Sequence, residues 1–375
     1  MQQRIISSEN EYEQLDNWLE EKGVSTLFLV CDSSISFLKD VNAHLEELSA
    51  RMNIVRFDEF QPNPLYESVV LGVKRFRESG AQAIAAIGGG SAMDTAKCIK
   101  LYSNMVGDGE DGSFLKQEIL PNRIPFLAMP TTAGTGSEAT RYAVIYYEGA
   151  KQSIADYSCI PDTVLMDAGV LKTLPAYQKK STMMDAFCHA IESFWSVNST
   201  EESRRFSRSA IETVLQHMEG YLANAEEGNK GMLLAANLAG KAINITQTTA
   251  GHAMCYKLTS LFGVAHGHAA ALCDRVLFDW MLTHTDQCID ERGEDFLKQV
   301  FGQIADAMGC GSAQEAAQKL ADIFAALDLE IPQADEEQFE VLKGSVNPVR
   351  LKNHPIKLTE EDIDMLYHKI LRVKQ

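Results

Sequence analysis

Residues 83–97 read AIAAIGGGSAMDTAK, an apolar run that passes through three glycines into a helical pattern. The run predicts a buried strand, and the residues after Ser91 predict a helix that begins directly behind the glycines. Glycines let the backbone approach a ligand closely, and the start of a helix offers unpaired N–H groups to an anion such as a pyrophosphate. The stretch is not the GxGxxG pattern, so by itself it is also compatible with a turn that binds nothing.

The flanking sequence repeats this alternation of strand and helix. Helical spacing is found at residues 66–80, and further buried strands are predicted at residues 26–32, 53–57, 124–130 and 163–167. Repeated strand–helix units indicate a parallel sheet covered by helices on both faces. Residues 141–154 instead predict a hairpin that turns at Glu148-Gly149.

The second half of the chain has a different pattern. Strand signals disappear from about Met183 onward, and long helical patterns follow at residues 201–225, 230–246, 294–309 and 316–328. A chain of 375 residues is also long for a single hydrophobic core. We therefore predict an α/β dinucleotide-binding domain over residues 1–178 and an all-helical domain over residues 179–375.

Composition and charge exclude several classes of protein. The net charge of −18 argues against a general binder of nucleic acid or of anionic membranes, although a local basic pocket for a small anion remains possible. No run of 18 apolar residues predicts a membrane span, and the polar N-terminus lacks a signal-peptide pattern. The eight cysteines form no CxxC pair, which favours reduced thiols and a cytoplasmic location.

A second loop follows the predicted strand at residues 124–130. Residues 130–144, PTTAGTGSEATRYAV, are rich in small and hydroxyl side chains. The loop would leave the same carboxyl edge of the sheet as the glycine turn, where ligands bind in open α/β folds. Clusters of this composition are otherwise ordinary turns.

Polar residues that can bind metals recur in the helical half. Asp185 and His189 are four residues apart on a predicted helix and so share one face. His252 and His266 would lie roughly 21 Å apart on a straight helix, too far to bind one ion. Gly263 predicts a break between them that would let the two imidazoles converge.

Four motifs in order, GGGSAMDTAK, PTTAGTGSE, DAFCHAIESF and AGHAMCYKL…VAHGH, resemble those of the iron-containing (group III) alcohol dehydrogenases. The resemblance implies a Rossmann-like N-terminal domain, a helical C-terminal domain and the architecture of dehydroquinate synthase-like proteins. It implies that one divalent ion, Fe(II) or Zn(II), is bound by Asp185, His189, His252 and His266. His268 is not among these ligands, and it either supports one of them or is an ordinary residue of its helix.

The resemblance also implies a dinucleotide site. A carboxylate at Asp32, facing the adenosine ribose, would repel a 2′-phosphate, so NAD is expected rather than NADP. Asp94 is expected in the first turn of its helix, near the helix dipole and the pocket. The remaining cofactor residues are Gly89, Gly90 and Ser91 at the pyrophosphate, and Thr131, Thr132, Ser137 and Lys151 near the nicotinamide.

The chain departs from many family members near the first metal histidine. Tyr256 stands where they have a second histidine, and Lys257 follows it; Arg141 is a further cation expected at the site. Arg350 and Lys352 add positive charge at a position that spacing does not fix. This version is most similar to the branch that reduces phosphonoacetaldehyde to 2-hydroxyethylphosphonate. We therefore expect an aldehyde/alcohol oxidoreductase for a small anionic substrate, with Tyr256, Lys257 and Arg141 at the reaction, and a homo-oligomer.

Three alternatives stay open. The chain could be a general short-chain alcohol or diol dehydrogenase of the same family, with Lys257 facing solvent. It could be a dehydroquinate synthase-like lyase, whose motifs match less well. It could also be a metal-binding protein without catalysis, although that leaves two predicted dinucleotide loops unexplained.

Overall fold

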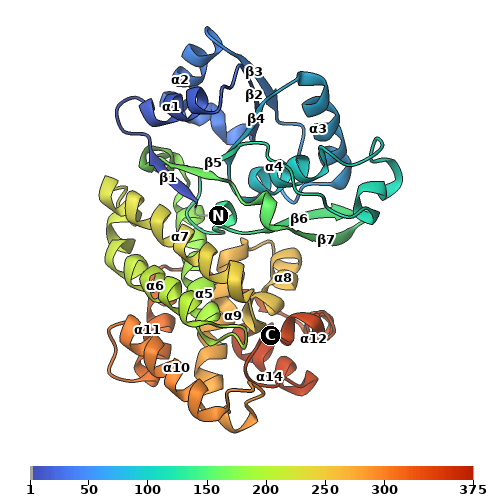
Figure 1. Cartoon of the computed structure of the whole chain (residues 1–375). Helices are drawn as coiled ribbons and strands as arrows, with labels where there is room; N and C mark the ends of the chain where they lie inside the picture. The colour runs from blue at the N-terminus through green and yellow to red at the C-terminus, as the bar shows by residue number, and fades with distance from the viewer. Residues whose placement is uncertain (1–2, 375) are drawn as a thin grey trace. The chain divides into compact units, whose positions relative to one another are not determined.

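The computed structural model describes residues 3–374, which form two compact units, one ending at Leu174 and the other beginning at Pro175 (Figure 1). The first contains a parallel sheet with helices, and the second is built from helices. These are the two fold types that the sequence predicts. The predicted division between residues 178 and 179 falls in the first turn of helix α5 (Ala176–Trp195), which Pro175 immediately precedes.

The first unit has a six-stranded sheet in which every strand pair is parallel. In sheet order its strands are β1 (Arg4–Ser7), β8 (Thr163–Met166), β5 (Phe126–Pro130), β4 (Ala83–Gly88), β2 (Thr26–Cys31) and β3 (Asn53–Phe57). The four main helices are α1 (Glu13–Glu21), α2 (Lys39–Ser49), α3 (Tyr66–Ser79) and α4 (Gly90–Tyr102). The edge strand β1 is not predicted by the sequence, because only one of its four side chains is buried.

Apolar side chains in register build the core of this sheet. Phe28, Ile84 and Phe126 are paired across β2, β4 and β5, and all three are fully buried. They belong to a cluster that also contains Val69 of α3 and Ile99 of α4. The central strands are therefore held firmly, and the loops at their carboxyl ends start from fixed positions.

A separate antiparallel hairpin, β6 (Tyr142–Tyr147) and β7 (Ala150–Ala155), follows the predicted course. Glu148 and Gly149 form its turn, and both have positive φ, at 51° and 74°. A two-residue hairpin turn with positive φ at both positions matches the twist of the flanking strands.

The second unit is organised around α5, which is buried along nearly its whole length and packs against α6, α7 and α9. The remaining helices are α6 (Glu201–Leu222), α7 (Glu226–Thr246), α8 (Ala250–Phe262), α9 (His266–Leu282), α10 (Glu294–Ala307), α11 (Ala313–Ala326), α12 (Glu336–Lys343), α13 (Pro348–Leu351) and α14 (Glu360–Ile370). Two parallel two-residue strands, β9 (Gln333–Ala334) and β10 (Arg372–Val373), add to a unit that the sequence predicts as purely helical. Between residues 3 and 374, no helix is both long and apolar enough to cross a bilayer.

Candidate functional site

The four predicted metal ligands come from three helices of the second unit. Asp185 and His189 lie one turn apart on α5, whereas His252 lies in the first turn of α8 and His266 begins α9. Helix α8 ends at Phe262, and the residue that caps it, Gly263, has φ of 70°. Glycine adopts this left-handed conformation without the strain of a Cβ, so the chain can turn back between the two histidines. The predicted break is therefore confirmed.

These four side chains converge. Oδ1 of Asp185 lies 3.5 Å from Nε2 of His252 and 3.9 Å from Nε2 of His266. Oδ2 of Asp185 lies 4.0 Å from Nδ1 of His189, and the rings of His189 and His252 stack with centroids 4.3 Å apart. Single ligand atoms from Asp185, His189 and His252 all fall within 4.8 Å of one another, as in a metal site.

Burial and missing hydrogen bonds indicate that this group fits a cation. Within residues 3–374, neither Oδ1 of Asp185 nor Nε2 of His252 has a hydrogen-bond partner, although both atoms are buried. Buried polar atoms are rarely left in this state, and a coordinated ion would satisfy both of them. One carboxylate with imidazoles suits Fe(II) or Zn(II).

Electrostatics favour positive charge at the same place. Burial alone would lower the pKa of His252, but the carboxylates of Glu192 and Asp185 outweigh it and raise that pKa to about 10. Burial would likewise raise the pKa of Asp185, but the neighbouring histidines bring it below its usual range. The cluster thus keeps an ionised carboxylate in the interior, and this carboxylate attracts a cation.

Glu192, which the sequence analysis missed, orients His252. It is fully buried on α5 and accepts hydrogen bonds from Nδ1 of His252, from the His252 backbone N–H at 2.9 Å and from Oγ1 of Thr249 at 2.6 Å. The bond to Nδ1 leaves Nε2 to face Asp185. The sequence signal for Glu192 is a carboxylate three residues after His189, on the helix that carries two of the predicted ligands.

The other two histidines of the α8–α9 segment, His266 and His268, make different contacts. Nδ1 of His266 lies 3.6 Å from Sγ of Cys255, and Nε2 faces Asp185. The ring of His268 instead bonds Tyr177 Oη at 3.0 Å and the carbonyl oxygen of Glu330 at 2.8 Å. His268 therefore ties α9 to its neighbours, which is the structural alternative left open by the sequence.

In the first unit, the predicted cofactor loops meet at the carboxyl edge of the sheet. Gly88 at the end of β4 pairs with Pro130 of β5, and the N–H of Thr131 donates to the Gly88 carbonyl at 3.0 Å. Asp32 follows the adjacent strand β2. A Cβ on Gly88 would lie 2.8 Å from Oδ2 of Asp32, so the absence of a side chain permits this close approach.

The start of α4 has the properties expected of an anion site. Gly89 is the N-cap and has no side chain to occupy the first N–H groups of the helix. A Cβ built on Gly89 would lie 3.6 Å from Thr132, which places the two loops in contact distance. Oγ of Ser91 accepts a hydrogen bond from the Asn63 N–H at 3.3 Å. The glycine loop (residues 88–91) and the threonine loop (residues 130–144) thus lie together, as predicted.

Asp94 differs from its predicted role. It lies in the second turn of α4, beyond reach of the helix start, and accepts hydrogen bonds from Ser137 Oγ at 2.9 Å and the Val144 N–H at 3.0 Å. Burial raises its pKa, which the positive charges of Lys97 and Lys151 partly offset. The expectation of a first-turn dipole partner is wrong because the helix begins at Gly90.

Lys97 is a second residue that the sequence analysis did not identify. It is fully buried, and its Nζ donates to Oγ of Ser137 at 3.0 Å, to Oγ1 of Thr140 at 3.1 Å and to the Tyr142 carbonyl at 2.7 Å. Together with Asp94 it anchors the threonine loop to α4 and to the hairpin. Ser137, predicted near the nicotinamide, is one of the contacts that fix this loop.

The three residues predicted at the reaction fall in different units: Arg141 in the first, and Tyr256 and Lys257 in the second. Arg141 belongs to the first unit, where its guanidinium lies 4.7 Å from the ring centroids of both Tyr142 and Tyr157. Tyr256 and the partly exposed Lys257 lie on α8. The Tyr256 ring is 5.4 Å from that of His266, and the Arg350 guanidinium is 4.4 Å from the Tyr256 ring.

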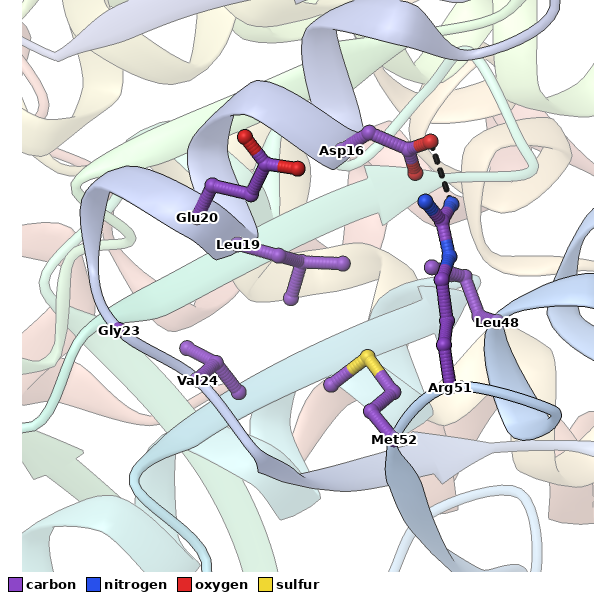
Figure 2. A pocket seen from close by; sticks show the side chains of 8 residues that line it. All are labelled: Asp16, Leu19, Glu20, Gly23, Val24, Leu48, Arg51 and Met52. Carbon is purple, nitrogen blue, oxygen red and sulfur yellow. Dashed lines mark hydrogen bonds and ion pairs between the residues drawn. The ribbon is translucent and has the colours of Figure 1, made fainter.

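Figure 2 shows a pocket in the first unit that contains none of the predicted residues. Asp16 and Arg51 form an ion pair at its edge, and Asp16 also bonds His44. Its lining residues are Asp16, Leu19, Glu20, Gly23, Val24, Leu48, Arg51 and Met52. They form a pocket apart from the carboxyl edge of the sheet, where the predicted cofactor loops meet.

Comparison with known proteins agrees with this geometry. The protein is 28% identical to phosphonoacetaldehyde reductase of Streptomyces viridochromogenes over 80% of this chain and 79% of the relative. It is also 28% identical to alcohol dehydrogenase 4 of Schizosaccharomyces pombe, over 90% and 82% of the two chains. An iron-containing alcohol dehydrogenase structure from Thermotoga maritima matches with a TM-score of 0.77 and 27% identity, covering 99% of this chain and 98% of the other.

Family models account for both units. The iron-containing alcohol dehydrogenase model matches residues 2–168, and the model of the C-terminal part of the Fe-containing alcohol dehydrogenase family matches residues 179–371. The motifs that carried the resemblance lie within these ranges. The chain therefore belongs to the iron-containing alcohol dehydrogenase family of oxidoreductases.

Proposed function

We propose that the protein is a metal- and NAD(H)-dependent enzyme that reduces a small anionic aldehyde to its primary alcohol. In this reaction the aldehyde gains a hydride from NADH and a proton, and NAD⁺ is released. The observation that carries the proposal is the convergence of Asp185, His189, His252 and His266, in which the buried Oδ1 of Asp185 and Nε2 of His252 would be satisfied by a bound cation. A family of alcohol dehydrogenases supplies the reaction class.

The four side chains would hold the metal, which as a Lewis acid polarises a carbonyl and stabilises the developing alkoxide. The protein's task is to keep the ligand atoms pointed inward. Glu192 does this for His252, and Cys255 contacts the outer nitrogen of His266. Ligands fixed in this way lose little freedom when the ion binds.

Tyr256 is suited to give the proton. Burial raises the pKa of its hydroxyl to about 12, although Arg350 partly opposes this. At neutral pH the phenol is therefore protonated, and Oη can donate to an alkoxide but serves poorly as a base. Tyr256 is therefore suited to the protonation step of the reduction.

The carboxyl edge of the sheet would bind the dinucleotide. Gly89, Gly90 and Ser91 at the start of α4 suit the pyrophosphate, and the loop with Thr131 and Thr132 borders them. The carboxylate of Asp32 favours a free ribose over a 2′-phosphate. NAD is therefore the proposed cofactor.

The anionic substrate is the finer part of the proposal, and phosphonoacetaldehyde is the specific candidate. It is supported by the cations Lys257 and Arg141 and by the named activity of the Streptomyces relative. A general alcohol dehydrogenase is the second candidate, because the Schizosaccharomyces relative is equally similar in identity.

Two measurements test the function. Metal analysis of the purified protein, followed by chelation, should show one divalent ion per chain and loss of activity that Fe(II) or Zn(II) restores. Following NADH absorbance, kcat/KM for phosphonoacetaldehyde should exceed that for butyraldehyde by tenfold or more. Equal values for the two aldehydes would reject the anionic substrate and favour the general dehydrogenase.

A further inference from the structure

We propose that Arg350 binds the anionic group of the substrate; this inference rests on the proposed reduction of an anionic aldehyde. Its guanidinium lies 4.4 Å from the ring centroid of Tyr256, whose ring is in turn 5.4 Å from that of His266. A chain of two contacts therefore connects Arg350 to a metal ligand, although 84 residues separate them in sequence.

The metal cluster is open on this side. The side chains of Asp185, His189 and His252 are 3%, 7% and 1% exposed, whereas that of His266 is 37% exposed. A small substrate would therefore approach past His266, next to Tyr256 and Arg350. With its carbonyl toward the ligand cluster, its other end would lie toward the arginine.

The segment that carries Arg350 is fixed to the same framework. Helix α13 packs against α8, and Nδ2 of Asn353 donates to the Thr248 carbonyl at 3.2 Å and to Oε1 of Gln247 at 2.9 Å. The Asn353 carbonyl accepts from the Val197 N–H at 3.0 Å. The short link between α7 and α8, which leads to His252, thus helps to fix the position of Arg350.

The guanidinium is available for a ligand. Within residues 3–374 it forms no ion pair, whereas Arg292 pairs with Asp290 and Arg208 with Glu212. The guanidinium packs on the Tyr256 ring and hydrogen-bonds its hydroxyl, which leaves the other N–H groups along the guanidinium edge for a ligand. That edge matches the paired oxygens of a phosphonate, sulfonate or carboxylate.

The test compares Arg350→Gln and Arg350→Lys with Lys352→Gln, a matched loss of charge at an exposed position two residues away. Each protein is assayed with phosphonoacetaldehyde and butyraldehyde, and metal content and thermal unfolding are measured alongside. Arg350→Gln should lower kcat/KM for phosphonoacetaldehyde about 10- to 100-fold, mainly through KM, because a charge-assisted contact is lost. Butyraldehyde reduction should fall much less, since only the contact of Arg350 with Tyr256 is then affected. Arg350→Lys should recover part of the loss, and Lys352→Gln should resemble wild type.

Equal losses on both aldehydes would overturn the inference, because Arg350 would then act by packing on Tyr256. An unchanged preference for phosphonoacetaldehyde in Arg350→Gln would also overturn it and assign the anion to another cation. If Arg350→Gln does not fold, the same comparison is decided by Arg350→Lys.

Inhibition of butyraldehyde reduction by ethylphosphonate separates this inference from the proposed substrate. If wild type shows no preference for phosphonoacetaldehyde but Arg350→Gln raises the inhibition constant about tenfold, Arg350 binds anions and only the substrate proposal fails. If neither preference nor inhibition depends on Arg350, the inference is rejected.

Discussion

Glu192 and His252 are joined by a hydrogen bond between Oε1 and Nδ1 in the fully buried interior of the second unit. The same carboxylate accepts from the backbone N–H groups of Thr249 and His252, so it also caps the start of α8. A predicted metal ligand and the helix that carries it are therefore positioned by one side chain. Orientation of the imidazole and local folding cannot be separated at this residue.

Replacing Glu192 with Gln should weaken metal binding while keeping the side chain's size. The amide oxygen can accept one of the hydrogen bonds, but the negative charge that supports His252 is lost. Metal affinity should fall about 10- to 100-fold, which is typical when the partner of a metal-bound histidine is removed. The measurement is titration of the metal-free protein with Zn(II), with Glu202→Gln, at an exposed position on α6, as the control. Unchanged affinity would show that Glu192 serves only the helix start.

Asp32 should decide between the two dinucleotides. Its carboxylate lies against Gly88 at the carboxyl edge of the sheet, where a 2′-phosphate would meet a negative charge. Asp32→Asn removes this repulsion, so the ratio of kcat/KM for NADH over NADPH should fall about tenfold, the effect of about 1.4 kcal/mol. Asp40→Asn, an exposed carboxylate on α2, is the control and should leave the ratio as in wild type. If Asp32→Asn also leaves it unchanged, the adenosine ribose binds elsewhere.

The parts of this molecule that were predictable are those with a local signal. Short apolar runs predict the central strands, and Gly263 predicts the turn that lets His252 and His266 converge. Edge strand β1 gives no such signal, since one buried side chain, Ile6, makes no apolar run. The paired strands β9 and β10 have only two residues each, too few for an apolar pattern that would predict them.

Buried charges were missed for a different reason. Glu192 and Lys97 lie in helical patterns, where a charged residue is usually on the solvated face. Their partners are distant in sequence: Thr249 lies 57 residues from Glu192, and Thr140 lies 43 residues from Lys97. Helical periodicity reports which face is apolar, but it does not report that a charge is paired inside the fold.

Gly251 should not tolerate a methyl group. A Cβ there would lie 1.8 Å from Oδ1 of Asp274 and 2.8 Å from Oε1 of Glu192, in the tightly packed region behind His252. We expect Gly251→Ala to lower the free energy of unfolding by about 1–3 kcal/mol or more, because neighbouring side chains must move. Gly302→Ala on α10 is the matched control, since its Cβ would meet nothing within 4 Å, and it should leave stability unchanged or raise it. Thermal unfolding of both variants measures the difference, and equal melting temperatures would show that the packing behind His252 is loose.

His354 should make the fold sensitive to mild acid. It is fully buried, and burial lowers its pKa to about 4, with the charge of Glu192 opposing the shift. Because the folded pKa lies below the ordinary value of about 6.5, the unfolded chain takes up the proton first as pH falls. The stability contributed by the neutral imidazole is therefore complete above pH 6.5 and is lost as pH falls toward 4.

In metal-free protein, His354→Leu should flatten the fall of melting temperature between pH 6.5 and 4. His217→Leu, on the partly exposed face of α6, should keep the wild-type slope. Parallel pH profiles for wild type and His354→Leu would mean that another buried group sets the acid limit.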